Sequence, residues 1–355
     1  IKTLGYYAMG AFNTSTRLFD GLMYLVVILA GGLSLVYGRI TAGDMVAYML
    51  YVTTLIATIR RIVEFAEQFQ RGMTGIERFA EIMDTPVTIG DAPDAVPLQP
   101  GPGDIRFENV SFEYPDDHNK VLHNVSLDIR PGERLALVGP SGGGKTTLCN
   151  LIPRFYDVTG GSVTVDGIDV RNMPQAQLHD LLGYVPQKGV LFSGTILDNL
   201  RWGDENASEE ECIRVAKLAC ADEFIERFPD KYNTWIEQGG SNVSGGQKQR
   251  LTIARALLRK PKVLILDDST SAVDTATDAK IRKAFREEIP GTTKIIIAQR
   301  ISSVQDADRI LVLDNGKIDG LGTHEELLKT NAIYQEVYNS QTQGGGDFDK
   351  QGGEQ

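Results

Sequence analysis

Two long apolar runs occupy the first part of the chain. Residues 21–38 and residues 45–59 contain no charged side chain. The first run is long enough to cross a bilayer as a helix, and the second becomes long enough with its flanks. The pattern predicts two membrane spans, over about residues 18–38 and 44–62, joined by a short turn. A buried helical hairpin in a soluble protein is the alternative.

Positive charges flank these runs on the side away from the turn. Arg17 precedes the first run, and Arg60 and Arg61 follow the second. Positive residues collect on the cytoplasmic side of membrane helices, so the turn is expected to face outward. Apolar residues then recur at helical spacing, which predicts an extension of the second helix into the cytosol. Residues 1–85 are therefore interpreted as the C-terminal part of a transmembrane domain. Because the chain begins with Ile1, we interpret it as lacking its natural N-terminus.

After this helical part the pattern changes twice. Residues 86–103 are rich in proline and glycine and are predicted to be a linker. Beyond them, over residues 104–340, apolar strand patterns alternate with helical ones, which predicts an α/β domain around a largely parallel sheet. The expected strands are 105–114, 121–129, 134–139, 162–167, 262–268, 293–299 and 309–316. The expected helices are 146–155, 209–228, 246–260 and 276–289. Residues 341–355 have no apolar pattern and are predicted to be disordered.

The charge balance narrows the class of partner. The 355 residues carry a formal net charge of −11, which argues against nucleic acid as a partner held by a basic surface. The three cysteines have neither the number nor the spacing of a disulfide framework or a metal site.

One glycine-rich loop carries a phosphate-binding pattern. The expected strand 134–139 leads into GPSGGGKT and then into a helix, which is the context that G-x-x-x-x-G-K-[ST] requires. Backbone N–H groups and the helix N-terminus can surround phosphate oxygens, the lysine can reach the outer phosphates, and the threonine hydroxyl can ligate Mg²⁺. The candidate ATP-binding residues are Gly139, Pro140, Ser141, Gly142, Gly143, Gly144, Lys145, Thr146 and Thr147.

Five further stretches accompany this loop in a fixed order. They are FEYP with Tyr114, YVPQ with Gln187, VSGGQ at 243–247, LILDD with Asp267 and Asp268, and IIIAQR with Gln299. In these motifs the chain resembles the nucleotide-binding domain of ABC transporters. With the helices before it, the chain resembles the C-terminal part of an exporter half-transporter. The resemblance covers nearly the whole chain, and a phosphate loop combined with SGGQ is highly specific.

The resemblance implies a role for each matched residue in binding ATP and Mg²⁺. Tyr114 would stack on adenine. Asp267, Thr146 and Gln187 would ligate Mg²⁺, and Gln187 could instead contact the attacking water. Ser244, Gly245, Gly246 and Gln247 would contact ATP bound to an opposing subunit through a helix N-terminus. Asp274 would lie along that dimer interface.

Two positions depart from the pattern of the family's active members. Asp268 stands where those members carry the glutamate that activates water, and its carboxylate is shorter by roughly 1.5 Å. Gln299 stands where they usually carry histidine, and an amide neither carries charge nor relays a proton. The pair, with Gln187, forms the candidate catalytic group. This pairing resembles the weak-site subunit of heterodimeric multidrug exporters, so a second half-transporter subunit is the expected partner.

Two other functions remain open. The chain could form a homodimeric exporter with Asp268 as the base, or a soluble ABC ATPase with a mechanical or regulatory role. For an exporter, the expected location is the cell membrane, as a multi-pass protein in contact with the lipid bilayer and with its ATPase domain in the cytoplasm. The transported substrate is an unidentified small molecule, lipid or peptide.

Overall fold

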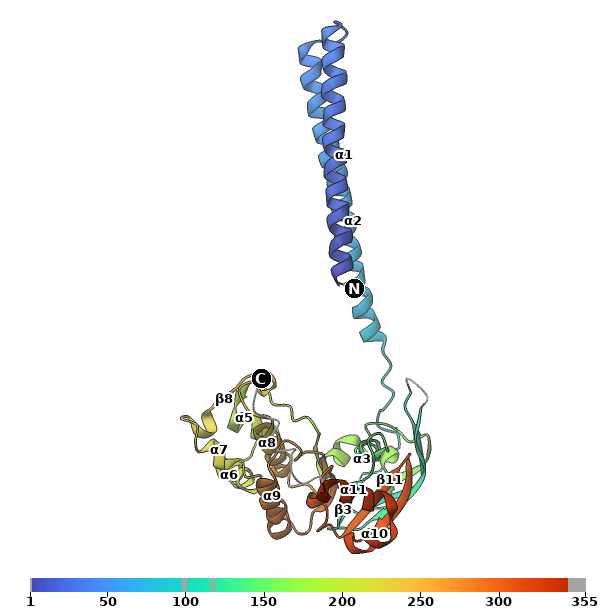
Figure 1. Ribbon diagram of the computed structural model, residues 1–355, viewed down its shortest axis with the longest axis vertical. Coiled ribbons are helices and arrows are strands. Elements are labelled where there is room, and N and C mark those ends of the chain that lie inside the picture. The colour runs from blue at the N-terminus through green and yellow to red at the C-terminus, as the bar shows by residue number, and fades with distance from the viewer. Residues whose placement is uncertain (1, 98–100, 116–118, 344–355) are drawn as a thin grey trace. The chain divides into compact units, whose positions relative to one another are not determined.

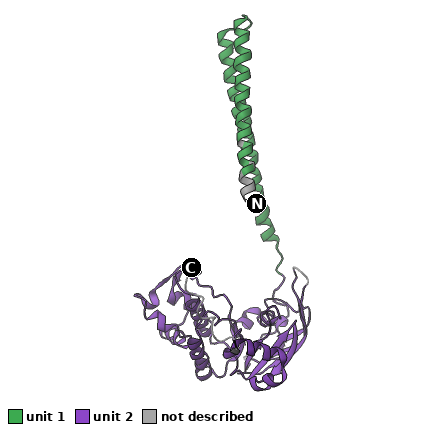
Figure 2. Cartoon of the chain, viewed as in Figure 1, with its two compact units in different colours: residues 1–87 green, residues 88–355 purple. Residues whose placement is uncertain are grey.

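The computed structural model describes residues 2–97, 101–115 and 119–343, coloured along the chain in Figure 1. The chain divides into two compact units between Val87 and Thr88, shown in Figure 2. Residues 98–100 of the predicted linker lie outside the described residues, as do residues 344–355 of the segment predicted to be disordered.

The first unit is a hairpin of two long helices, α1 (Lys2–Val36) and α2 (Ala42–Asp84). Gly38 makes the turn with a φ of 67°, a conformation that glycine adopts at low cost. Thr41 then caps α2 through a capping box with Asp44. The helices are long and apolar enough to cross a membrane, and their large apolar side chains are mostly exposed.

Two polar contacts join these helices. Arg60 forms an ion pair with Asp20, and the hydroxyl of Tyr24 donates to Thr53 Oγ1 over 3.3 Å. Tyr24 and Thr53 lie inside the two apolar runs, whereas Asp20 and Arg60 lie at their ends, where the opposite charges pair.

The second unit is built on a six-stranded sheet of order β12-β11-β3-β10-β9-β6. Every neighbouring pair is parallel except β11 with β12. The strands are β3 (Arg134–Val138), β6 (Leu182–Val185), β9 (Val263–Asp267), β10 (Thr293–Ile297), β11 (Arg309–Asp314) and β12 (Lys317–Gly322). All five residues of β9 are buried, as expected for a central parallel strand.

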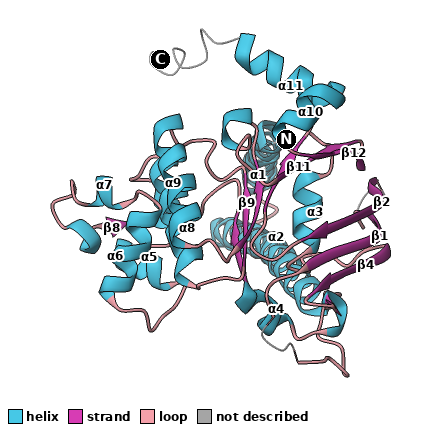
Figure 3. Cartoon of the chain, turned by 90° about the horizontal axis from the view of Figure 1, so that it is seen from below, coloured by secondary structure: helices cyan, strands magenta, loops and turns pink. Residues whose placement is uncertain are grey.

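A second sheet stands apart from the first and was not expected as a separate layer. It is antiparallel, of order β2-β1-β4-β5, and lies beside α3 in Figure 3. Its strands are β1 (Ile105–Glu113), β2 (Lys120–Ile129), β4 (Gly160–Val165) and β5 (Ile168–Asp169). The apolar residues of β1 alternate, which buries one face, whereas β3 and β9 contain four consecutive buried apolar residues each.

Helices surround the sheets. They are α3 (Lys145–Leu151), α4 (Gln175–Leu181), α5 (Ile196–Arg201), α6 (Glu209–Leu218), α7 (Asp222–Ile225), α8 (Gly245–Leu258), α9 (Thr275–Glu288), α10 (His324–Thr330) and α11 (Ala332–Gln343). Helices α5, α6, α7 and α8 share an apolar cluster with one face of β9, and β7 (Gly194–Thr195) pairs with β8 (Trp235–Ile236) as a short antiparallel two-stranded sheet beside them. Short 3₁₀ turns are η1 (Val170–Asn172), η2 (Lys231–Asn233), η3 (Gln238–Gly240) and η4 (Ile301–Ser303).

Three helices differ from the sequence prediction, and the first of them, α3, ends at Leu151 and not at residue 155. The segment 209–228 is not one helix, because Cys220 adopts a φ of 52° and turns the chain between α6 and α7. Helix α11 continues to Gln343, three residues into the segment predicted to be disordered. The side chain of Gln341 holds this end of α11 through hydrogen bonds to Gln299 and Ile301.

Candidate functional site

The phosphate loop connects β3 to α3 and needs its glycines for space and for backbone angle. Gly139, Gly142 and Gly144 have φ values of 143°, 79° and 97°. A Cβ on Gly139 would lie 2.1 Å from the carbonyl oxygen of Leu313, which excludes any side chain there. The loop therefore lies against β11 with its backbone exposed to a ligand rather than covered by side chains.

Lys145 is the first residue of α3 and folds back over this loop. Its Nζ donates to the carbonyl oxygens of Gly139 at 2.9 Å and Pro140 at 2.7 Å. Burial lowers the pKa of Lys145, while the nearby charges of Asp267 and Asp268 oppose that shift. The ammonium group is thus held at the loop by acceptors that an anionic phosphate could replace.

Asp267 ends β9 and faces the first turn of α3. Thr146 Oγ1 donates to Asp267 Oδ1 over 3.0 Å, and the hydroxyl of Tyr184 donates to Asp267 Oδ2 over 3.2 Å. Burial raises the pKa of Asp267, and these two hydrogen bonds act in the opposite direction. The carboxylate is therefore fixed in orientation beside the threonine hydroxyl.

Asp268 follows at once in a strained conformation, with a φ of 46°. Its backbone N–H donates to the carbonyl oxygen of Ile297 over 2.9 Å, which ties the end of β9 to the end of β10. Two amide groups converge on Asp268 Oδ2, namely Gln299 Nε2 at 2.8 Å and Gln187 Nε2 at 3.2 Å. Burial raises the pKa of Asp268, and the hydrogen bond from Gln187 partly offsets this. The candidate catalytic side chains thus form one hydrogen-bonded group.

These groups line a single cavity of about 660 Å³. Among the predicted residues, its lining comprises Tyr114, Gly139, Ser141, Gly142, Gly143, Gly144, Lys145, Thr146, Thr147, Gln187, Asp267, Asp268 and Gln299. Pro140 lies on the loop outside that lining. The hydroxyl of Tyr114 lies 2.9 Å from Thr147 Oγ1, and its ring packs edge-on against Phe112 and Tyr156. Tyr114 is therefore the aromatic side chain that lines the cavity together with the polar groups of the phosphate loop.

The SGGQ stretch lies elsewhere, at the start of α8. Ser244 is the N-cap, its Oγ accepts from the N–H of Gln247, and the side chain of Gln247 accepts from the N–H of Ser244. A Cβ on Gly246 would lie 2.7 Å from the carbonyl oxygen of Ala272, so this position fits glycine alone. Asp274 caps α9 through the N–H of Thr277. None of these residues lines the phosphate-loop cavity.

A buried glutamine connects the two regions. Gln249, on α8, donates to the carbonyl oxygen of Gln187 and to Ser271 Oγ, each over 3.3 Å. Its Oε1 accepts from the N–H of Ala272 over 3.0 Å. The helix that begins at Ser244 is therefore hydrogen-bonded to the segment that carries Gln187.

Several residues of the site were not predicted from the sequence. Tyr184 lies on the four-residue strand β6, and its place in the YVPQ stretch, three residues before Gln187, was the available signal. Asn119, Val121 and Val337 also line the cavity, and Val337 belongs to α11, far along the chain.

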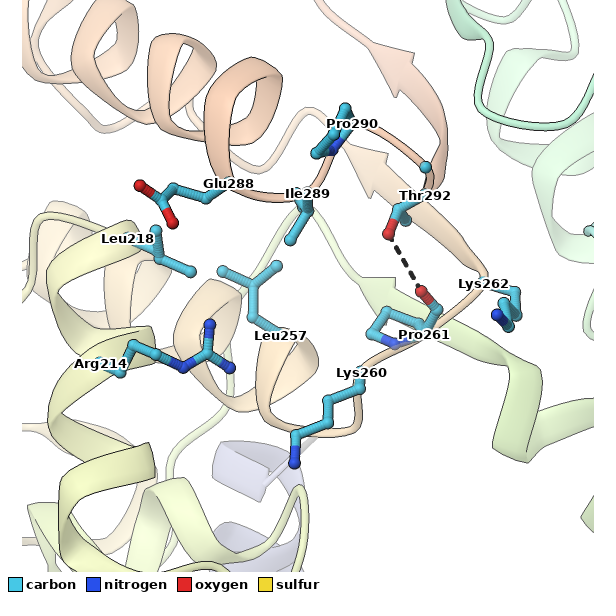
Figure 4. A pocket seen from close by; sticks show the side chains of 11 residues that line it. Arg214, Leu218, Leu257, Lys260, Pro261, Lys262, Glu288, Ile289, Pro290 and Thr292 are labelled. Atoms are coloured by element: carbon cyan, nitrogen blue, oxygen red, sulfur yellow. Dashed lines mark hydrogen bonds between the residues drawn. The ribbon is translucent and has the colours of Figure 1, made fainter.

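A separate hollow of about 340 Å³ lies between α6, the end of α8 and the loop before β10, as Figure 4 shows. Leu218, Leu257 and Ile289 supply its apolar surface, and the exposed Arg214 and Lys260 stand beside them. It contains no group of the phosphate loop or of the carboxylate pair, so it is not part of the site described above.

The donor set of the cavity fits the expected Mg²⁺. Thr146 offers a hydroxyl oxygen, Asp267 a carboxylate and Gln187 an amide oxygen, and hard oxygen donors are the ligands that Mg²⁺ prefers. Over the described residues, no cluster of three or more His, Cys, Asp or Glu side chains suits a softer metal.

A strand, a glycine-rich loop and a helix, with a carboxylate at the end of a nearby parallel strand, define a P-loop nucleotide-binding domain. Residues 122–271 match the family model described as ABC transporter, and the chain accordingly carries the ATP-binding domain of an ABC transporter. Its fold is that of an ABC exporter, with apolar helices ahead of the ATPase domain.

Individual proteins and one solved structure support this assignment. The chain is 39% identical over 340 residues to the uncharacterized ABC transporter ATP-binding protein YwjA of Bacillus subtilis (strain 168), covering 96% of this chain and 59% of that protein. It is 40% identical over 325 residues to an ATP-dependent lipid A-core flippase of Desulfotalea psychrophila (strain LSv54 / DSM 12343), covering 92% and 56%.

A bacterial Atm1-family ABC exporter solved with ATP bound matches with a TM-score of 0.73 and 34% identity, over 96% of this chain and 59% of that one. The chain thus spans a little more than half the length of the proteins it matches.

Proposed function

We propose that this chain is the ATP-binding and membrane-spanning part of an exporter half-transporter whose own ATP site turns over slowly. The observation that carries the proposal is the group formed by Asp268, Gln299 and Gln187 beside an intact phosphate loop. ATP would bind in the cavity of about 660 Å³, with adenine against Tyr114 and the outer phosphates at Lys145. Hydrolysis would convert ATP and water into ADP and phosphate.

The residues around the phosphates favour binding over cleavage. Thr146, Asp267 and Gln187 would hold Mg²⁺, which when bound offsets the negative charge that develops on the phosphate oxygens. A general base must lie within hydrogen-bond distance of the proton it takes, and Asp268 is one methylene short of a glutamate. One of its oxygens already accepts from two amides, and Gln299 has no group that could relay a proton.

The fast site would then lie on a partner subunit. Ser244, Gly245 and Gly246 form a capped helix start outside this chain's own cavity. A helix N-terminus carries partial positive charge and free N–H groups, which suits the γ-phosphate of ATP held by another subunit. A second half-transporter subunit with its own glutamate is therefore the proposed partner, with Asp274 at the interface between the two.

The helical unit supplies the link to transport. α1 and α2 would cross the lipid bilayer of the cell membrane, with the ATP-binding unit in the cytoplasm. Closing and reopening of the ATP-bound dimer would switch the membrane helices between inward-facing and outward-facing states. The transported substrate would be a small molecule, a lipid or a peptide; the name of one similar protein, a lipid A-core flippase, concerns a lipid.

ATP turnover by the full-length subunit, purified alone and with its partner, tests this proposal. We expect low turnover alone and high turnover together. Replacing the phosphate-loop lysine of the partner should abolish turnover of the pair, whereas Lys145→Ala should reduce it only in part. Fast turnover by the subunit alone would refute the slow-site assignment.

The carboxylate of Asp268 also supports a second candidate, a homodimeric exporter in which Asp268 is the base. Asp268 lines the cavity, and its pKa is raised by burial, which strengthens a carboxylate as a base. In that case Asp268→Asn should abolish turnover of the purified homodimer. Turnover that survives this substitution would rule the second candidate out.

A further inference from the structure

The last helix among the described residues, α11, contributes to the nucleotide cavity. Val337 of α11 lines it, and Tyr334, one turn earlier, is fully buried. Tyr334 belongs to an apolar cluster with Val138 of β3 and Ile301 of η4. α11 is therefore packed against the strand that leads into the phosphate loop and against the segment that follows Gln299.

Gln341 lies one turn beyond Val337 and contacts the backbone on both sides of Arg300. Its Nε2 donates to the carbonyl oxygen of Gln299 over 2.6 Å, and its Oε1 accepts from the N–H of Ile301 over 2.8 Å. One side chain thus satisfies a donor and an acceptor in the short segment that separates β10 from η4. A planar amide held at both ends fixes the orientation of the backbone it contacts.

A second set of hydrogen bonds, from Arg300, ties the segment between β10 and η4 to another loop. Arg300 donates to the carbonyl oxygens of Val273 at 3.1 Å and Ser271 at 3.4 Å, which lie in the loop after β9. Gln299 in turn donates its side-chain amide to Asp268. Arg300 therefore ties this segment to the loop after β9, and Gln341 ties the backbone of Gln299 to α11.

We propose that Gln341 is a positioning residue for Gln299, through which α11 sets the direction of the Gln299 amide in the cavity. The inference deepens the proposed function, since it concerns the same slow ATP site, and it rests on that proposal for the identity of the ligand. Gln341 is exposed and does not line the cavity. It would therefore act through the backbone of Gln299 and not by contact with the nucleotide.

The exposure of Gln341 makes the proposal testable without loss of the fold. Gln341→Met removes both hydrogen bonds at nearly constant size. Gln341→Glu keeps an acceptor for the N–H of Ile301 but places an anionic oxygen against the Gln299 carbonyl. Gln335→Met is the matched control, because Gln335 on the same helix also donates to a backbone carbonyl, that of Leu328, away from the cavity.

The experiment uses the full-length subunit assembled with its partner. 8-Azido-ATP labelled on the α- or the γ-phosphate is bound in the dark, chased with unlabelled ATP, and cross-linked by light at intervals. After separation of the two subunits, the α label on this chain measures nucleotide retention. The ratio of γ to α label measures cleavage at this chain's own site.

We expect Gln341→Met and Gln341→Glu to slow loss of the γ label by about tenfold with retention unchanged, since a misplacement of about 1 Å caused by a distant mutation costs up to about a hundredfold. Gln335→Met should behave as wild type. In a Gln299→Ala background, Gln341→Met should change the rate by less than about twofold, because the side chain that it positions is absent.

Two outcomes would overturn the inference. One is a Gln341→Met rate equal to that of wild type, and the other is a slowing that multiplies with that of Gln299→Ala. A wild-type chain that loses its γ label as fast as its partner would instead refute the slow site, and the Gln341 comparison would still stand.

Discussion

The side-chain amide of Gln299 donates to Asp268 Oδ2 over 2.8 Å, across the ends of β10 and β9. In the motifs that this chain resembles, these two positions usually hold histidine and glutamate. The two residues that depart from the family pattern are therefore hydrogen-bonded to each other.

Restoring both residues should accelerate the site. Asp268→Glu combined with Gln299→His returns a base of full length and a group that relays protons, and such catalysis is worth on the order of 10²-fold or more. We expect faster loss of γ-phosphate label from this chain in the assembled transporter. Asp268→Asn with Gln299→His is the control and should bring no gain. An unchanged rate in the double variant, with ATP still bound, would place the slow step elsewhere.

Tyr184 offers a test of the proposed Mg²⁺ ligands. Its hydroxyl donates to Asp267 Oδ2 and to Asn150 Oδ1, so Tyr184→Phe removes the group that orients the carboxylate. Loss of a residue that orients a metal ligand typically costs about 10- to 100-fold in metal affinity. We expect the Mg²⁺ concentration needed for ATP retention to rise by about tenfold. Retention of ATP in EDTA should be unaffected, and a matching loss there would instead indicate general damage to the cavity.

A comparison of two serine N-caps distinguishes the effect of Ser244 on stability from its effect on ATP turnover. Ser244 caps α8 and Ser208 caps α6, each through a capping box. Either serine-to-alanine change should lower the free energy of unfolding by about 1 kcal/mol. Ser244→Ala should also reduce ATP turnover by the assembled pair by about tenfold, whereas Ser208→Ala should not. Equal turnover in the two variants would argue against contact between Ser244 and the partner's nucleotide.

A buried lysine predicts a pH dependence of stability. Lys294 is 1% exposed, its Nζ donates to the carbonyl oxygens of Ile289 and Thr292, and burial lowers its pKa to about 8. Arg134 lowers the pKa further, and Asp308 opposes it. Between about pH 8 and the ordinary lysine pKa of 10.5, the unfolded chain binds the proton that the folded chain has released. The free energy of unfolding should therefore rise with pH through that window.

Lys294→Met should lack this rise, which amounts to about 3 kcal/mol for wild type. Denaturation of the solubilised chain followed by tryptophan fluorescence measures it, because both tryptophans, Trp202 and Trp235, belong to the ATP-binding unit. Parallel pH profiles for wild type and variant would contradict the assignment. The carbonyl groups left without their donor in the variant contribute a cost that does not change with pH.

The features that could be predicted from the sequence are those that neighbouring residues determine. The phosphate loop was predictable because its glycines, Lys145 and Thr146 are contiguous and serve one ligand. The central strands β3, β9, β10 and β11 were predictable because each contains a run of consecutive apolar residues that are mostly buried. The separate antiparallel sheet was not, since strand patterns specify burial of a face and leave the choice of neighbour to distant segments.

The unpredicted parts of the site depend on contacts between distant residues. Tyr184 acts on Asp267, 83 positions away, and Gln341 acts on Gln299, 42 positions away. Neither belongs to a pattern with a fixed spacing. The chain breaks after α6 because Cys220 adopts a positive φ. A cysteine in the sequence does not predict that conformation, whereas a glycine or an asparagine would suggest it.

The place of β10 between β3 and β9 has a consequence for how this site can change over generations. Ile297 of β10 is opposite Leu137 of β3 and opposite Asp267 of β9. The register of β10 therefore aligns the end of β3 with the end of β9. Substitutions such as those at 268 and 299 leave that alignment intact. Insertion or deletion of one residue within β10 would turn alternate side chains to the other face and displace Gln299 from both partners at once. Evolution can therefore substitute the side chains of this site, whereas the length of β10 must be kept.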